Sequence, residues 1–591
     1  MNDSPKEFYT HQLDGFQQEL KAVKKQLNVS STLRLLVFIT IAFAIYILWG
    51  NMRIVIPMAI IGIAVFLFLV TRHSKLKYQK SLSQALIDYN TRELKVLDRD
   101  FHDLPDGATY NDPLHAYSQD IDLFGRGSFF QYLNRTALAS GTDELARLFL
   151  SNDITDIVNK QEAIKELSKL AKWRQQFYAK ASLVKTEIPA TQVTQWLEKY
   201  TAVIPPFSKV LSYGFSAATI LGLIAYYFQF IPGIVVFGLF ILGLIISAGF
   251  MGDIGTLSNQ VGKAQSTFDQ YAKLISSIEE QEMESVLLSR KRELIINKQA
   301  ATSGKLKEFS KLLDALDQRN NILVAVLVNG LFLRDIVIAY RIEKWIAAHQ
   351  DEVSVWFETI AFFDAYNSLG NFGFNHPNYY YPEIVAEGKV LESTKAIHPL
   401  LDPEVAVPSD IVIDTAQFFI VTGANMAGKS TFLRAVSLQI VMGNLGLPLA
   451  AEKVKYQPIK LITSMRTTDS LADDESYFFS ELKRLKFIVE EIKNDRYFIV
   501  LDEILKGTNS TDKAIGSRKF VDKLVASQST GIIATHDLSL TIAAEELAPV
   551  DNYFFDARIV NDELFFDYTL KKGVCENMNA SFLLKKMKIV D

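Results

Sequence analysis

The residues best suited to chemistry lie in the stretch VTGANMAGKSTFLRA, residues 421–435, which contains Gly423-x-x-x-x-Gly428-Lys429-Ser430. This spacing is typical of a phosphate-binding loop between a strand and a helix, because its glycines let backbone N–H groups approach phosphate oxygens. Lys429 can reach the β- and γ-phosphates of ATP, and the Ser430 hydroxyl can bind Mg²⁺. The predicted ATP-binding residues are Gly423, Ala424, Asn425, Met426, Ala427, Gly428, Lys429, Ser430 and Thr431.

Acidic residues end a second predicted strand, in the stretch RYFIVLDE at residues 496–503. Asp502 is expected to hold Mg²⁺ together with Ser430, and Glu503 to orient or deprotonate the attacking water. His536 follows a third predicted strand, GIIAT, from which it can hydrogen-bond the γ-phosphate. The predicted catalytic residues are therefore Glu503, Lys429 and His536. The alternative, two solvated acids and a structural histidine, is disfavoured by the phosphate loop upstream.

After about residue 410, short apolar runs alternate with helical segments, and this pattern predicts the elements that position these residues. QFFIV, RYFIVLDE and GIIATHD read as buried strands, and residues 429–441 read as a helix. This alternation predicts an α/β fold with a parallel sheet and crossover helices, the ABC-like form of a P-loop NTPase. DARIVNDELFFDYTL reads as a β-hairpin that turns at Asn561-Asp562 and need carry no chemistry.

The upstream chain reads as helical, and a loop rich in Asn, Gly, Pro and Tyr is expected near 365–383. Four apolar runs interrupt it, at 35–49, 54–70, 210–228 and 234–250. They form two closely spaced pairs, which predicts two transmembrane helical hairpins; buried core helices are the alternative. A fifth run at 322–333 is too short to cross and is expected to be a buried soluble helix.

Positive residues predict the orientation of the hairpins. Lys21, Lys24, Lys25 and Arg34 precede the first pair and four more cations follow it, whereas Arg53 alone lies between the two runs. Cations favour the cytoplasmic side, so both hairpins should enter and return. The predicted location is the inner cell membrane, multi-pass, with the nucleotide site in the cytoplasm.

Composition limits the other possibilities. The 591-residue chain carries 62 Lys and Arg against 67 Asp and Glu, a net charge of −5, so any nucleic-acid contact needs a local basic patch. Cys575 is the one cysteine, which excludes a disulfide within the chain. The eight histidines show no close pairing at ligand spacing, so no zinc site is expected.

The motifs resemble those of the MutS mismatch-repair ATPases. TGANMAGKST resembles the phosphate loop of that family, with Asn425 and Met426 in matching places, and LDEILKGTNSTD and ATHDLSLT resemble its acidic strand and switch-histidine segment. SMRTTDSLADDESYFFSELKRL looks like the segment that the family uses in trans, with Ser476 and Glu481 matching. The usual Ser-Gly-Arg before that serine is Asp473-Asp474-Glu475 here. Residues 120–150 resemble the start of the family's helical core.

The resemblance implies a transmembrane relative of MutS, with a helical core, levers and an ATPase domain. The family's mismatch-recognition and connector domains find no counterpart in the first 100 residues. A homodimer is implied, in which Ser476 of each protomer completes the other's ATP site. The expected boundaries are a cytoplasmic N-terminal segment at 1–32, hairpins at 33–71 and 208–251, helical core at 72–207 and 252–383, and ATPase domain at 384–591.

Two functions remain open. The first is a membrane-anchored ATPase that opens and closes a helical core with ATP and Mg²⁺, and binds DNA by family resemblance without reading mismatches. The second is a mechanical ATPase that acts on a membrane or envelope protein without DNA. A scaffold with an inactive site is disfavoured by the intact set of Lys429, Ser430, Asp502, Glu503 and His536.

Overall fold

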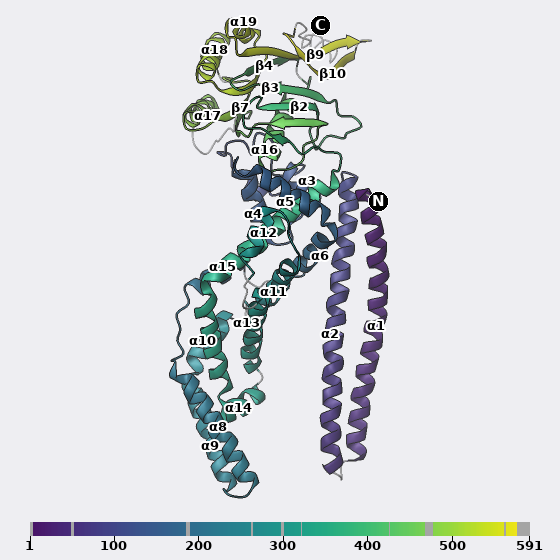
Figure 1. Ribbon diagram of the computed structural model, residues 1–591, viewed down its shortest axis with the longest axis vertical. Helices are drawn as coiled ribbons and strands as arrows, with labels where there is room; N and C mark the ends of the chain where they lie inside the picture. Colours follow the sequence, from purple (N-terminus) through teal and green to yellow (C-terminus); the bar gives the residue numbers. More distant parts are fainter. Residues whose placement is uncertain are drawn as a thin grey trace.

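The computed structural model has three levels along its long axis (Figure 1). Two β-sheets with their helices lie at one end, short helices and a long helix form the middle, and two pairs of helices reach the opposite end. The structure describes residues 4–48, 52–184, 189–261, 264–296, 301–320, 322–424, 426–466, 477–506, 508–560 and 563–575.

The first hairpin consists of two long helices that lie side by side, α1 (Pro5–Ile47) and α2 (Met52–Leu97) (Figure 1). The start of α1 is well specified, because Ser4 and Glu7 form a capping box and Pro5 occupies the first turn. Both helices continue far beyond the predicted apolar runs. Their polar ends therefore carry the hairpin directly into the middle of the molecule.

The middle of the molecule is helical. Its helices are α3 (Phe129–Leu133), α4 (Ala139–Leu150), α5 (Ile157–Lys169), α6 (Ala171–Ser182), α7 (Ala190–Glu198), α10 (Met251–Val261), α11 (Gln265–Glu280), α12 (Val286–Glu293), α13 (Thr302–Asp317) and α15 (Arg334–Asn375). The second apolar pair is α8 (Phe207–Tyr227) and α9 (Gly233–Gly249), with α14 (Ile322–Phe332) beside it. Among the described residues, three helices are long and apolar enough to cross a membrane, or four if α9 and α10, bent by 57°, count as one span.

The structure contradicts two expectations for this region. The loop expected near 365–383 is helical as far as Asn375, because buried partners satisfy its polar side chains: the Ser368 hydroxyl accepts the Arg135 N–H at 3.0 Å. The helix α14 is not a buried soluble helix, since Ile322 and Leu327 are 75% and 56% exposed. Its apolar face points away from the protein interior.

The C-terminal part contains two sheets. The strands are β1 (Glu383–Ile384), β2 (Leu391–Ala396), β3 (Ser409–Ile413), β4 (Phe418–Gly423), β5 (Lys453–Tyr456), β6 (Lys460–Ser464), β7 (Tyr497–Asp502), β8 (Thr530–Ala534), β9 (Val550–Val560) and β10 (Glu563–Lys572). The smaller sheet has the order β1-β5-β2-β3, and the larger has the order β10-β9-β4-β8-β7-β6. In the larger sheet every pair is parallel except β9 with β10.

The larger sheet carries the predicted chemistry. Its strands β4, β7 and β8 coincide with the three predicted segments, and β9 with β10 forms the predicted antiparallel hairpin, whose turn at Asn561-Asp562 lies outside the described residues. Apolar residues bury both faces of its central strands, as a parallel sheet requires. One face packs on α16 (Lys429–Asn444), and the other packs on α17 (Tyr477–Glu491) and α18 (Ser510–Ala526). A short helix, α19 (Ala543–Glu546), precedes β9.

Candidate functional site

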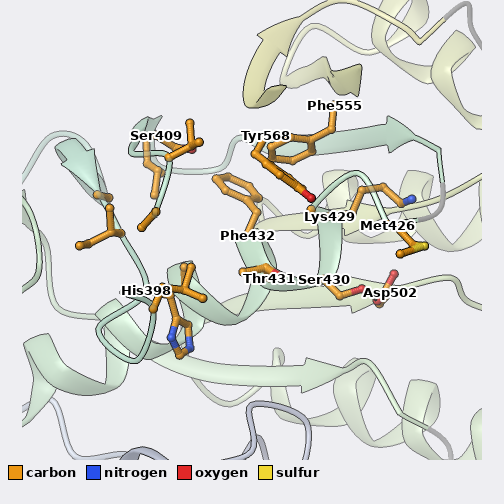
Figure 2. A pocket seen from close by; sticks show the side chains of 18 of the residues that line it. His398, Ser409, Met426, Lys429, Ser430, Thr431, Phe432, Asp502, Phe555 and Tyr568 are labelled. Atoms are coloured by element: carbon orange, nitrogen blue, oxygen red, sulfur yellow. Dashed lines mark hydrogen bonds between the residues drawn. The ribbon is translucent and has the colours of Figure 1, made fainter. Parts of the chain in front are cut away.

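A cavity of about 760 Å³ lies where β4, β7 and β8 end and α16 begins. Figure 2 shows its two ends, with Ser430 and Asp502 at one side and His398 and Ser409 at the other. In a parallel sheet the carboxyl ends of the strands meet at one edge, where ligands bind. The predicted residues from three separate segments therefore meet in one cavity.

The predicted phosphate loop needs glycine at both of its ends. Gly423 ends β4 at φ +146°, and a Cβ there would come within 2.6 Å of the Phe555 carbonyl oxygen. Gly428 precedes α16 at φ +108°, a left-handed backbone that favours glycine. Met426 also has a positive φ, 67°, and its side chain is 78% exposed. Asn425, predicted to bind ATP, lies outside the described residues.

Lys429 is buried at the base of the loop. Its Nζ donates to the carbonyl oxygens of Gly423 at 2.8 Å and Ala424 at 3.0 Å. Burial lowers the pKa of Lys429, and the nearby carboxylates of Asp502 and Glu503 oppose this shift. The loop thus holds the ammonium group among the backbone atoms that would surround a phosphate.

Ser430 and Asp502 form a pair of oxygen donors. The Ser430 hydroxyl lies on the first turn of α16 and donates to Asp502 Oδ2, at the end of β7, across 2.8 Å. Oxygen ligands of this kind, completed by phosphates and waters, fit Mg²⁺. Within the described ranges no group of three or more His, Cys, Asp or Glu residues could hold a metal ion. A cation at this pair would therefore depend on the nucleotide for further ligands.

Glu503 and His536 form a second pair beside Lys429. His536 Nε2 lies 2.9 Å from Glu503 Oε1 and 3.2 Å from Lys429 Nζ. The hydrogen bond from His536 lowers the pKa of Glu503 to about 2, with help from Lys506 and against the effect of burial. Glu503 is thus a carboxylate at neutral pH. One His536 nitrogen cannot donate to the carboxylate and accept from the ammonium at once. Nε2 donates to Glu503 when it carries a proton and accepts from Lys429 when it does not.

The backbone holds Glu503 in a sparsely populated conformation. Its φ is 51°, and its N–H donates to the Ala534 carbonyl oxygen, at the end of β8, across 2.9 Å. The following turn is fixed by Glu481 on α17, whose buried carboxylate accepts the N–H groups of Leu505 and Lys506. Positive φ at a bulky residue is costly and is often found at functional sites. Glu481 thus contacts the turn that follows Glu503 in its own chain, while Ser476 lies outside the described residues.

The apolar end of the cavity is absent from the predicted site. It is lined by residues from distant segments, among them His398, Leu401, Val405, Phe432, Phe555 and Tyr568. The Tyr568 ring covers the phosphate loop, since a Cβ on Gly428 would lie 3.2 Å from it. The β9–β10 hairpin, to which no chemistry was assigned, thus supplies two aromatic walls. The sequence signal for these walls is the alternation of aromatic residues in a strand. Ordinary sheet packing gives the same pattern, so the signal does not identify a binding site.

An ionic cluster joins this site to the helical middle. Asp122 accepts from Arg466 at 2.6 and 2.8 Å and pairs with Arg434 of α16 at 2.8 Å. Asp120 accepts the Arg466 N–H at 2.8 Å. The helix that carries Lys429 and Ser430 is thereby tied to the segment before α3.

Known proteins resemble this part of the chain. Residues 419–588 match the family profile described as MutS domain V. The DNA mismatch repair protein MutS of Syntrophomonas wolfei is 27% identical over 300 residues, which is 49% of this chain and 33% of that protein. The protein of the same name from Desulfatibacillum aliphaticivorans is 28% identical over 294 residues, 48% of this chain and 31% of its own length.

The C-terminal half of the chain is similar to MutS proteins. The human MutS protein homolog 4 is 30% identical over 198 residues, 32% of this chain and 20% of that protein. The matched stretch thus spans about a third or less of the length of these MutS relatives. The MutS-like region includes the larger sheet, the phosphate loop, Asp502, Glu503 and His536.

Proposed function

We propose that this protein is a membrane-anchored, MutS-like ATPase. The observation that carries the proposal is the convergence of Lys429, the Ser430–Asp502 pair and the Glu503–His536 pair in one cavity. The cavity has the apolar and polar ends that a nucleotide requires. Residues 423–431 would bind the phosphates, and the aromatic residues of the cavity would contact the base.

Each residue has a role in ATP hydrolysis. Lys429 and the loop N–H groups bind the phosphates, and Ser430 and Asp502 would hold Mg²⁺, which supplies charge neutralisation when bound. Glu503, ionised at neutral pH, orients the water that attacks the γ-phosphorus, so that the bond to the β–γ bridging oxygen breaks. His536 can hydrogen-bond the γ-phosphate and then release it, which links the Glu503 contact to the presence of that phosphate.

Membrane anchoring is the second part of the proposal. In the apolar windows of α1, α2 and α8, 6%, 11% and 17% of residues are buried, so these helices are not part of a soluble core. The apolar ends of both hairpins reach the same end of the molecule, opposite the sheets (Figure 1). A single bilayer could take both, with the sheets on the cytoplasmic side as the flanking cations favour. We keep the domain boundaries expected from the sequence.

The working unit in this proposal is a homodimer with Ser476 acting in trans. An exposed apolar side chain at the site supports a second copy there: Met426 lines the cavity and is 78% exposed. ATP would close the dimer, hydrolysis would open it, and the Asp122 cluster would pass the motion to the helical middle.

DNA binding is a second candidate function, supported by the names of the mismatch-repair relatives. The second hairpin, α8 and α9, favours a membrane or membrane-protein partner instead. Residues 210–250 contain no Lys or Arg, and the exposed side chains there include Phe230 at 81% and Ile234 at 70%. Binding to DNA requires cations against phosphates and falls steeply with salt.

The test is ATP turnover by the purified full chain in lipid vesicles, with and without duplex DNA. Glu503→Gln is expected to lower turnover by about 10²-fold or more while ATP still binds, because positioned acid–base groups contribute about 10²–10⁴. Glu490→Gln, on the exposed side of α17, is the matched control and should leave turnover unchanged. Normal turnover by Glu503→Gln would reject the assigned role. Salt-sensitive stimulation by DNA would favour the second candidate.

A further inference from the structure

The short helix α14 lies between α13 and the long helix α15 in the chain, beside the base of the second hairpin (Figure 1). Its residues 322–333 contain no charged side chain, and Asn329 is the one strongly polar residue among them. Ile322, Val326 and Leu327 are 75%, 41% and 56% exposed. These three exposed aliphatic residues give the first two turns of α14 an apolar surface that the described chain leaves uncovered.

The C-terminal turn of α14 packs directly on the second hairpin. A Cβ on Gly243 of α9 would lie 2.2 Å from the Gly330 carbonyl oxygen, so the two backbones touch. The Ser216 hydroxyl of α8 donates to the Phe332 carbonyl oxygen across 3.0 Å. Close backbone approach at glycine and a serine hydrogen bond between helices are typical of helix packing in membranes.

The chain enters and leaves α14 at a polar boundary. Arg334, after the helix, donates to Gln318, before it, across 3.0 Å. Leu333 at the break has φ 50°, and the freed groups are satisfied locally: Asn329 Oδ1 accepts the Asp335 N–H at 2.9 Å, and Asn329 Nδ2 donates to Asp335 Oδ2 at 2.8 Å. Irregular backbone is tolerated near a bilayer when it is satisfied in this way.

We propose that α14 is a lipid-contacting helix that enters only the cytoplasmic leaflet of the bilayer, beside α8 and α9. This inference rests on the proposed membrane anchoring. An 11-residue helix is about 16 Å long, well short of the ~30 Å hydrocarbon core, so it cannot cross. The neighbouring hairpin also exposes apolar side chains, among them Leu221 at 66% and Ile245 at 63%. Figure 1 shows α14 beside α8, at the end of α13 and α15.

The consequence is mechanical. The helix α15 runs from α14 to the level of the sheets, and its far end carries Asn371 and Ser368, which bind the N-terminal hairpin and the segment before α4. If lipid holds α14, the adjoining N-terminal end of α15 is fixed at the membrane surface. Movement at the nucleotide site would then tilt or shift α14 and the second hairpin together.

The test uses single cysteines labelled with an environment-sensitive fluorophore in the full chain, in phosphatidylcholine–phosphatidylglycerol vesicles. Leu327→Cys reports on α14. Leu221→Cys, exposed on α8, is the membrane reference, and Lys307→Cys, exposed on α13, is the aqueous reference. The parent chain, whose Cys575 is buried, measures background labelling. Nitroxide lipids with the quencher near the headgroup or deep in the acyl chain report depth.

The expected result is a blue-shifted emission at Leu327→Cys, with stronger quenching by the shallow than by the deep nitroxide. Emission like that of Lys307→Cys, while Leu221→Cys is blue-shifted, would overturn the inference and leave the anchoring intact. Water-like emission from Leu221→Cys would instead reject the anchoring itself. A blue shift at Leu327→Cys without quenching by either lipid would mean that protein covers α14, which also overturns the inference.

Discussion

Single residues decide the shape and chemistry of the cavity at the end of the larger sheet. Tyr568 covers Gly428, and with Phe432 and Phe555 it lines the cavity between the Ser430–Asp502 side and the His398–Ser409 side (Figure 2). In the proposed function these rings contact the base, which does not change during hydrolysis. Residues there should influence ATP binding more than the chemical step.

Tyr568→Ala should therefore raise the KM for ATP by about fivefold and change kcat little, because an aromatic stacking contact contributes about 1 kcal/mol. Phe565→Ala is the matched control, since Phe565 lies on the same strand, is 56% exposed and does not line the cavity. Steady-state ATPase kinetics measure both. Equal losses of kcat and kcat/KM for Tyr568→Ala would contradict a base-binding role.

His376 makes stability depend on pH. Its ring is buried between the Tyr132 hydroxyl and the Phe372 carbonyl oxygen, both at 2.8 Å, and burial lowers its pKa from 6.5 to about 4. Because the folded-state pKa lies below the unfolded value, this contribution is fully present above pH 6.5. It is lost as the pH falls towards 4, by up to about 3 kcal/mol.

We expect the melting temperature of the solubilised chain to fall between pH 7 and pH 5. His376→Gln should remove part of that fall, and His398→Gln another part, since burial also lowers the pKa of His398 to about 4. The exposed His11→Gln is the control and should keep the full dependence. A wild-type melting temperature that is flat over this pH range would contradict the assignment.

At the scale of elements, a buried polar cluster joins the first hairpin to α15. Glu93 of α2 accepts from Arg135 and from the amides of Asn371 and Asn375, at 2.8 and 3.0 Å for the amides. The Tyr9 hydroxyl of α1 donates to the amide oxygens of the same two asparagines. These contacts explain why α15 continues through a stretch rich in Asn and Gly, and they attach both helices of the first hairpin to α15.

Glu93→Gln should destabilise the folded chain by about 3–5 kcal/mol, because it leaves the buried Arg135 guanidinium without its carboxylate. Asp98→Asn is the matched control, since it breaks the surface pair of Lys6 and Asp98, also between α1 and α2, which is worth less than about 1 kcal/mol. Thermal or denaturant unfolding in detergent compares the two. Similar small losses for both would show that the cluster does not hold the hairpin.

At the scale of the whole molecule, the proposed dimer makes each ATP site a product of two chains. The site holds its own Lys429, Ser430 and Asp502, whereas Ser476 would come from the second copy. Two variants with different defects should then rescue each other. A site that is complete within one chain would show no such rescue.

Lys429→Ala and Ser476→Ala should each abolish turnover alone. Mixed before reconstitution, they should recover about a quarter of the wild-type rate, since half the dimers of a twofold assembly would be mixed and each would carry one intact site. Mixing Lys429→Ala with Glu503→Gln is the control and should recover nothing, because both defects lie in the same half-site. Full activity of Ser476→Ala by itself would contradict the composite site.

Short-range patterns in the sequence located the phosphate loop, the acids after β7, the histidine after β8 and the apolar runs. Such patterns are readable because a tight turn needs glycine, buried strands need apolar runs, and a membrane span needs length. The tertiary structure decided what depends on distant segments. It assembled the apolar lining of the cavity from residues near 398, 432 and 568, continued α15 through a predicted loop by burying Asn371 against Glu93, and packed the end of α14 on Gly243. Packing between remote elements has no local signature in the chain.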